Sequence, residues 1–281
     1  MFWRATKVQT RQLLRQWPAL LVFALLMYLV ARNFLHNVRI YKGTEVYDMY
    51  QSMHLLLLNN DSLIQGARLT STLIQIFPFL MALPAGLSYA RDRQVGISNV
   101  MIARMGKRTY CMSRLLSVFL TTFVVFTVPF LIEIGLNCIS FPLNATDTFS
   151  HTSYYDEHYL ETIGNYLFPK LYIISPYFYA VVMTLQFGMI ASLFACFVMG
   201  LSVLIPLRFR VLYLLPPYIM LSSVVYFFPN RVGASHQYWY FYVLIFNTTH
   251  NKYVNIYGAV LCALALFSVI SVLYTSRKDA L

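Results

Sequence analysis

The chain has 281 residues, of which 59% are hydrophobic and 11% are charged, and its formal net charge at pH 7 is +11. A soluble domain carries about a quarter charged residues, so this composition excludes that class. Several apolar runs of about 18 residues or more are long enough to cross a bilayer as helices. We therefore expect an all-α polytopic membrane protein with one transmembrane domain over residues 1–281.

The first 16 residues precede the first apolar run and carry four basic side chains. Phe2, Trp3 and Val8 lie among them, and this mixture predicts an interfacial helix on the cytoplasmic leaflet. The alternative is a basic tail that only fixes topology. Because no small-x-small cleavage site follows the apolar run, a retained anchor is favoured over a signal peptide.

Six apolar runs are expected to span the membrane. Prolines in the second, third and fifth of them predict kinks. Glu133 is the only acidic residue within a run, one turn from its outer end, and we favour a structural or snorkelling role over a substrate or proton site. The predicted spans are about 17–34, 73–90, 115–137, 176–206, 211–228 and 253–274.

The basic residues predict the orientation of these spans. With the N-terminus inside, the inner segments hold fourteen of the 21 Lys and Arg residues and only two acids, Asp92 and Asp279. The outer segments hold seven basic and seven acidic residues. The positive-inside rule therefore places both termini in the cytoplasm. Topology and anionic lipid explain the positive charge, so no nucleic-acid partner is expected.

Three outer segments are predicted, at about 35–72, 138–175 and 229–252. The third contains HQYWYFYVLIF, from His236 to Phe246, which is too short to span and indicates a re-entrant or interfacial segment. The second contains acidic and histidine residues that match no specific metal motif, so a solvated loop is favoured and no metal or cofactor is expected. These residues are His151, Asp156, Glu157, His158 and Glu161.

The inner segment between the second and third runs is SYARDRQVGISNVMIARMGKRTYCMSRLL, from Ser88 to Leu116. After Gly96, apolar residues recur with the spacing of one helix face, and Gly106 predicts its end. A short amphipathic helix inside the cell can dock on a soluble partner. The alternative is a helix that rests on lipid. The face consists of Ile97, Val100, Met101 and Met105.

Several catalytic motifs are absent from the sequence. It has no G-x-x-x-x-G-K-[ST] loop for ATP phosphates, no G-x-S-x-G nucleophile turn and no H-E-x-x-H zinc helix. The four cysteines form no CxxC pair and no evident disulfide framework. We therefore expect no catalytic residues, and we expect any ATP hydrolysis to occur in a partner chain.

Three adjoining stretches resemble small permeases of the type-2 ATP-binding-cassette (ABC) exporters. LPAGLSYARDRQVG is similar to that family's proline-containing second span and its Tyr/Arg-Asp/Glu-Arg-x-x-Gly turn. ISNVMIARM is similar to the short helix that follows, and GKRTYCMSRLL to the basic stretch with a Tyr that leads into the third span. Six spans, cytoplasmic termini and an aromatic outer segment before the last span also resemble that family.

The resemblance implies a half-transporter in the plasma membrane of a bacterium. Two permease subunits, identical or different, would form the translocation path, and two separate ATPase subunits would bind beneath them. It also implies that residues 96–105 form a coupling helix. The implied ATPase-coupling residues are Arg91, Asp92, Arg93, Gly96, Ile97, Val100, Met101, Arg104 and Met105.

Within this set, Arg91, Asp92 and Arg93 are expected to orient the junction electrostatically. The candidate cavity-lining residues are chosen for polarity or aromaticity on the second and fifth spans, and helix–helix packing is the alternative for each. They are Gln75, Phe79, Tyr218 and Ser222.

Other functions remain open. A related ABC-type complex for peptide-antibiotic sensing or resistance would use the same ATPase partner. A membrane-embedded enzyme or assembly factor would need a reactive polar cluster, and only the stretch from His151 to Glu161 comes close. A channel or ion-coupled carrier is disfavoured because the spans contain few charges.

Overall fold

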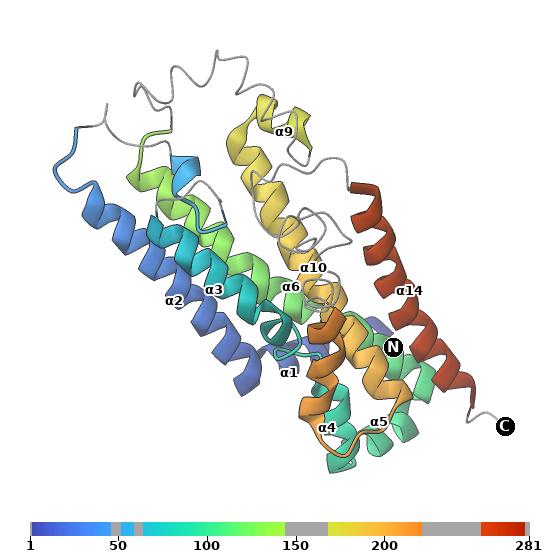
Figure 1. Cartoon of the computed structure of the whole chain (residues 1–281). Coiled ribbons are helices and arrows are strands. Elements are labelled where there is room, and N and C mark those ends of the chain that lie inside the picture. Colours follow the sequence, from blue (N-terminus) through green and yellow to red (C-terminus); the bar gives the residue numbers. More distant parts are fainter. Residues whose placement is uncertain (1, 46–51, 59–63, 144–167, 221–253, 279–281) are drawn as a thin grey trace.

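The computed structural model describes residues 2–45, 52–58, 64–143, 168–220 and 254–278, and all regular elements in these ranges are helical (Figure 1). Four of the described helices are long and apolar enough to cross a membrane. The all-helical class is thereby confirmed for the described residues, with four helices that could cross a membrane. These helices are α2 (Trp17–Ile40), α6 (Lys107–Ser140), α10 (Pro176–Leu204) and, through Gly258–Thr275, α14 (Val254–Lys278).

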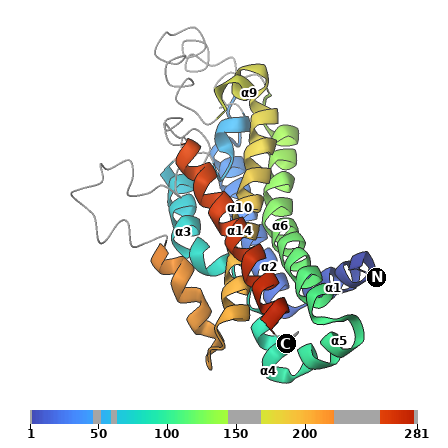
Figure 2. The ribbon, with the colours of Figure 1, turned by 90° about the vertical axis from the view of Figure 1, so that its right-hand side faces the viewer.

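Helices α6 and α10 form the centre of the bundle. In α10, 72% of the apolar window is buried, whereas the value for α14 is 22%. A helix that is apolar on all sides is stable in such a buried position. Ser175 caps the start of α10 by accepting a hydrogen bond from the Phe178 N–H at 3.3 Å. Figure 2 shows α6, α10 and α14 running side by side.

Aromatic rings fill the middle of this bundle. Phe187 of α10 lies 5.1 Å from Phe130 and 5.8 Å from Phe126, both of α6, between ring centroids. It also lies 5.4 Å from Phe77 of α3 (Ile64–Leu80). Tilted and edge-to-face pairs of this kind add favourable energy beyond the burial of apolar area. The cluster fixes α3 against the two central helices.

The predicted second span, 73–90, is not one regular helix. Helix α3 begins earlier and ends at Leu80, residues 81–87 form turns, and α4 (Ser88–Val95) follows. Pro84 has no N–H group to continue a helical ladder, which explains the break. At Gly86 a Cβ atom would lie 3.1 Å from the carbonyl oxygen of Ala195 in α10. The turns therefore pack closely on α10.

The C-terminal part of α6 holds a buried polar cluster. One carboxylate oxygen of Glu133 accepts hydrogen bonds from the Asn33 side-chain amide and the Leu57 N–H, both at 2.8 Å. The Asn37 amide donates to the carbonyl oxygen of Leu55 at 3.0 Å. These bonds hold the short segment that begins with the 3-10 helix η2 (Ser52–Leu55) between α2 and α6. The Glu133 side chain is thus buried and hydrogen-bonded, which fits a structural role and not a snorkelling one.

The other predicted spans differ mainly at their ends. The third begins earlier, because α6 starts at Lys107, and the fourth and sixth coincide closely with α10 and α14. Of the fifth, only 211–220 is described: η3 (Arg210–Leu214) is followed by helical residues 215–220. Residues 221–228, the 229–252 outer segment and the stretch from His151 to Glu161 lie outside the described residues.

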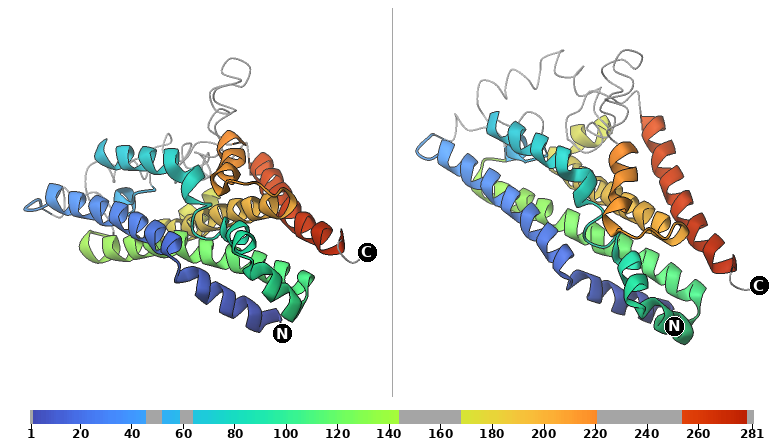
Figure 3. Two further views of the ribbon diagram at one scale, coloured as in Figure 1. Left: turned by 90° about the horizontal axis from the view of Figure 1, so that it is seen from below. Right: turned by 60° about the horizontal axis from the view of Figure 1, so that its bottom comes forward.

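One end of the molecule gathers most of the described basic side chains. Helices α1 (Phe2–Leu14), α4 and α5 (Ile97–Met105) lie there with the C-terminal end of α14, whereas α9 (Pro169–Ile174) lies at the opposite end (Figures 1 and 3). Helix α1 packs on α6, since the Ser117 hydroxyl donates to the Thr6 carbonyl oxygen at 3.1 Å. We call this the basic end. Its cytoplasmic placement remains a prediction.

Candidate functional site

Helix α5 crosses the basic end between two glycines, within the range expected from the sequence. Gly96 has φ +80° and ψ −1° and joins α4 to α5, while Gly106 has φ +80° and ψ 146° and joins α5 to α6. Side chains other than hydrogen are disfavoured at such angles. A Cβ atom at either glycine would meet nothing within 4 Å. The two corners therefore need glycine for backbone conformation rather than for space.

The apolar residues of α5 divide between two faces. Ile97 and Val100 are 43% and 55% exposed. Met101 and Met105 are half-buried and pack, together with Ile102, against a cluster formed by other helices. Of the predicted docking face, the two methionines therefore pack toward the bundle and are only partly exposed. The cluster includes Leu13, Tyr89, Tyr110, Cys111 and Met199.

The outward face of α5 is therefore narrower than predicted. Ile97 and Val100 are one turn apart, and the exposed Arg104 follows one turn later. Val95, the last residue of α4, is 63% exposed. We call Ile97, Val100 and Arg104 the outer face of α5.

Asp92 does not face outward with the other predicted junction residues. Its carboxylate forms an ion pair with Arg114 of α6 at 2.6 Å, and both side chains are almost fully buried. The Tyr110 hydroxyl donates to the same carboxylate oxygen at 3.4 Å. A charge-assisted bond in a buried setting holds α4 firmly against α6. Arg91 is half-buried and Arg93 is exposed.

Gln94 connects α4 to the chain that leaves α10. Its amide donates to the carbonyl oxygen of Arg208 at 3.2 Å, and its side-chain oxygen accepts a hydrogen bond from Arg210 Nε. The Tyr213 hydroxyl donates to the Ile205 carbonyl oxygen at 2.6 Å, which braces the same turn. These contacts tie α4 to α6 through Asp92 and to the chain that follows α10 through Gln94.

Two of the four predicted cavity residues come together. The rings of Phe79 and Tyr218 stack with centroids 4.9 Å apart and planes 26° apart. Gln75 is exposed one turn before Phe79 on α3, and Ser222 lies outside the described residues. Phe79 and Tyr218 are both accessible at this contact, so they mark a surface shared by α3 and the helical residues 215–220.

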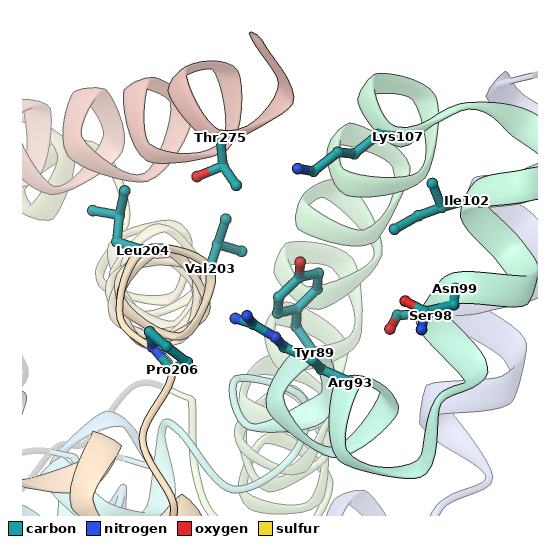
Figure 4. A pocket seen from close by; sticks show the side chains of 10 residues that line it. All are labelled: Tyr89, Arg93, Ser98, Asn99, Ile102, Lys107, Val203, Leu204, Pro206 and Thr275. Atoms are coloured by element: carbon teal, nitrogen blue, oxygen red, sulfur yellow. The ribbon is translucent and has the colours of Figure 1, made fainter. Parts of the chain in front are cut away.

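A different cavity lies at the basic end. It measures about 520 Å³ and lies between α4, α5 and the start of α6 on one side and the ends of α10 and α14 on the other (Figure 4). The sequence did not predict it, because five separate elements supply its walls. Of the predicted coupling residues, only Arg93 lines it. Its polar lining residues are Tyr89, Arg93, Ser98, Asn99, Lys107 and Thr275.

The chain was compared with known families and structures. No protein-family model, curated protein or solved structure matches it. The resemblance to ABC permeases therefore rests on the sequence pattern of residues 83–116 and on the predicted topology.

The described residues of the basic end make contacts that suit binding and movement. Within the described ranges, no group of three or more His, Cys, Asp or Glu side chains is placed to hold a metal ion. The elements of the basic end instead form a connected unit: an exposed helix on two glycine corners, an ion pair and a side-chain bridge. Such a unit can receive a partner and convey displacement to the central helices.

Proposed function

We propose that this chain is the membrane-spanning permease subunit of an ABC exporter. With a second permease subunit it would form the translocation path, and separate ATPase subunits would supply the energy. The observation that carries the proposal is the outer face of α5, where Ile97 and Val100 are exposed between two glycine corners at the basic end. A short helix with an apolar and basic surface suits a groove on a soluble partner.

The contacts around α5 support a coupling role. A push on α5 reaches α6 through the Gly106 corner, and it reaches α4 through Gly96. The Asp92–Arg114 pair and the Gln94 bridge make α4 move together with α6 and the end of α10. Closure of the ATPases would in this way reorient the central helices.

The break between α3 and α4 is the point at which this movement would change the angle between the two helices. Residues 81–87 form turns rather than helix, so α3 can tilt relative to α4. Phe79, whose ring stacks on that of Tyr218, lies on α3 just before this break. In the proposed cycle, opening and closing of this aromatic contact changes access to the path between the subunits.

The proposal is tested by capture of the ATPase. The tagged chain, expressed in its native host, should copurify with a P-loop ATPase. Ile97→Asp with Val100→Asp should reduce the captured ATPase by about tenfold or more, since burial of two unpaired carboxylates in an apolar interface is strongly unfavourable. The chain itself should remain inserted in the membrane, because both side chains are exposed.

A matched control uses the opposite end of the molecule. Ile173→Asp with Ile174→Asp adds the same charge on α9, where the two side chains are 63% and 75% exposed. This variant should capture as much ATPase as the unaltered chain. Full retention of the ATPase by the α5 variant, or no ATPase with the unaltered chain, would overturn the proposal.

The α5 variant and changes in the stretch from His151 to Glu161 together separate the alternative functions. An ABC complex for peptide-antibiotic sensing or resistance would also lose its ATPase with the α5 variant, but would confer resistance instead of bulk export. An enzyme or assembly factor would lose activity when His151, Asp156 and His158 are changed to Ala, and would not depend on α5. In the proposed exporter, those three changes leave ATPase capture intact.

A further inference from the structure

Two cationic side chains point into the cavity at the basic end. Figure 4 shows the guanidinium group of Arg93, from α4, and the ammonium group of Lys107, from the start of α6, both directed into the space beside the Tyr89 hydroxyl. Among the described residues that line the cavity, none is acidic. The ion pair of Asp92 is made with Arg114, so that carboxylate is directed to α6. The lining therefore favours an anion.

The first turn of α5 forms another part of the wall. Ser98 and Asn99 line the cavity, and α5 begins at Ile97. The N-terminal end of a helix carries partial positive charge and favours anions, phosphate above all. Ser, Asn and Tyr side chains add neutral hydrogen-bond donors. Two cations, the first turn of a helix and these donors line one partly open cavity, and such groups suit a phosphate group.

The remaining wall is apolar. Ile102, Val203, Leu204 and Pro206 line the cavity beside the polar groups. The volume of about 520 Å³ lies within the usual range of small-molecule sites and exceeds the needs of one small inorganic anion. The space suits a phosphate group that bears an organic substituent.

We infer that this cavity binds a phosphate-bearing ligand, with Arg93 and Lys107 as its ionic contacts. The phosphate belongs either to the headgroup of an acidic phospholipid or to a soluble phosphate compound. The inference does not rest on the proposed export function, because it requires neither an ATPase nor a second permease subunit. Since Ser98 and Asn99 belong to α5, occupancy would also hold that helix in place against α10 and α14.

The test uses the full chain purified in detergent and two probes. Native mass spectrometry measures binding of dioctanoylphosphatidylglycerol, and a thermal unfolding shift measures binding of inorganic phosphate at constant ionic strength. Arg93→Gln with Lys107→Gln should lower the affinity for the probe by about tenfold or more, because both charge-assisted contacts are lost. Arg93→Lys with Lys107→Arg keeps both charges and should retain most of the binding.

Two further variants separate a built site from general charge attraction. Arg4→Gln with Arg108→Gln removes two exposed cations that do not line the cavity, and should leave binding unchanged. Thr275→Phe fills the cavity from α14 and keeps both cations, so it should abolish binding.

The outcomes decide the source of the phosphate and the inference itself. Saturable lipid binding that the cavity variants remove identifies a phospholipid headgroup, whereas a shift with phosphate alone identifies a soluble ligand. Binding of neither probe to the unaltered chain overturns the inference. Equal loss in the Arg4 and Arg108 control, or full binding after Arg93→Gln with Lys107→Gln, overturns it as well.

Discussion

At the residue scale, the Asp92–Arg114 pair combines burial with opposite charge. Replacing Asp92 by Ala leaves the guanidinium group of Arg114 buried without its anion. Loss of one partner of a buried ion pair costs about 3–5 kcal/mol, and we expect a decrease of that size in the free energy of unfolding. Denaturant unfolding of the purified chain in detergent measures it.

The double variant Asp92→Ala with Arg114→Met is the control for this prediction. With both charges removed, no unpaired ion remains, so most of the lost stability should return. If the double variant is as unstable as the single one, the effect comes from packing and not from the unpaired charge.

Glu133 supports a second prediction at this scale. Glu133→Gln keeps the side-chain oxygen that accepts from Asn33 and Leu57, so stability should change little. Glu133→Leu removes that oxygen, and each buried donor left unsatisfied costs about 1–3 kcal/mol. Thermal unfolding of the two variants compares them directly. Equal stability of the Gln and Leu variants would contradict the structural role, and loss of function in the Gln variant would favour a proton site.

Neither of these partnerships was predictable from the chain alone. Asp92 and Arg114 are separated by 22 positions, and Glu133 and Leu57 by 76. The sequence indicated that Asp92 belongs to a junction and that Glu133 has a structural or snorkelling role. The identity of each partner depends on how the helices cross, which side-chain packing determines and local spacing does not.

At the element scale, the two glycines that flank α5 differ in how strongly their backbone angles require glycine. The angles of Gly96 are left-handed helical, where a non-glycine residue costs about 1–2 kcal/mol and Asn is tolerated. The angles of Gly106 are close to a region that is essentially restricted to glycine, at up to about 3 kcal/mol. Thermal unfolding should therefore rank Gly106→Ala as less stable than Gly96→Ala, with Gly96→Asn least affected.

Gly135 provides the matched control for these substitutions. It lies within α6, and a Cβ atom there would meet nothing within 4 Å. Gly135→Ala should leave stability unchanged or raise it slightly, because alanine favours helix. If all three alanine variants were equally stable, the corners would not require glycine.

The helices that local pattern specifies were predicted well, and the others were not. Gly96 and Gly106 delimit α5 in the sequence as they do in the structure. The break after Leu80 was missed, since Pro84 indicates a kink equally well, and the close packing of Gly86 on α10 is a tertiary contact that local pattern does not show. The inward orientation of Met101 was also missed, because α5 is apolar on two sides and tertiary packing decides between them.

At the scale of the whole molecule, burial separates the central from the peripheral helices. Only 33% of the apolar window of α2 and 22% of that of α14 is buried, against 72% for α10. The exposed surfaces of α2 and α14 are apolar, so within a bilayer they contact lipid or another subunit. In the proposed dimer, the two permease subunits would cover part of this area.

The separation of charge between the two ends of the molecule predicts its orientation. Fourteen basic residues belong to the predicted inner segments, and each contributes about 1 kcal/mol near an anionic leaflet, so the reverse orientation is strongly disfavoured. In a chain whose native cysteines are replaced by Ala, Arg108→Cys should react with a membrane-impermeant maleimide only from the cytoplasmic side. Ile174→Cys, at the opposite end, should react only from outside. The reverse pattern would invert the topology and place α5 beyond the reach of any ATPase. The replaced cysteines are Cys111, Cys138, Cys196 and Cys262.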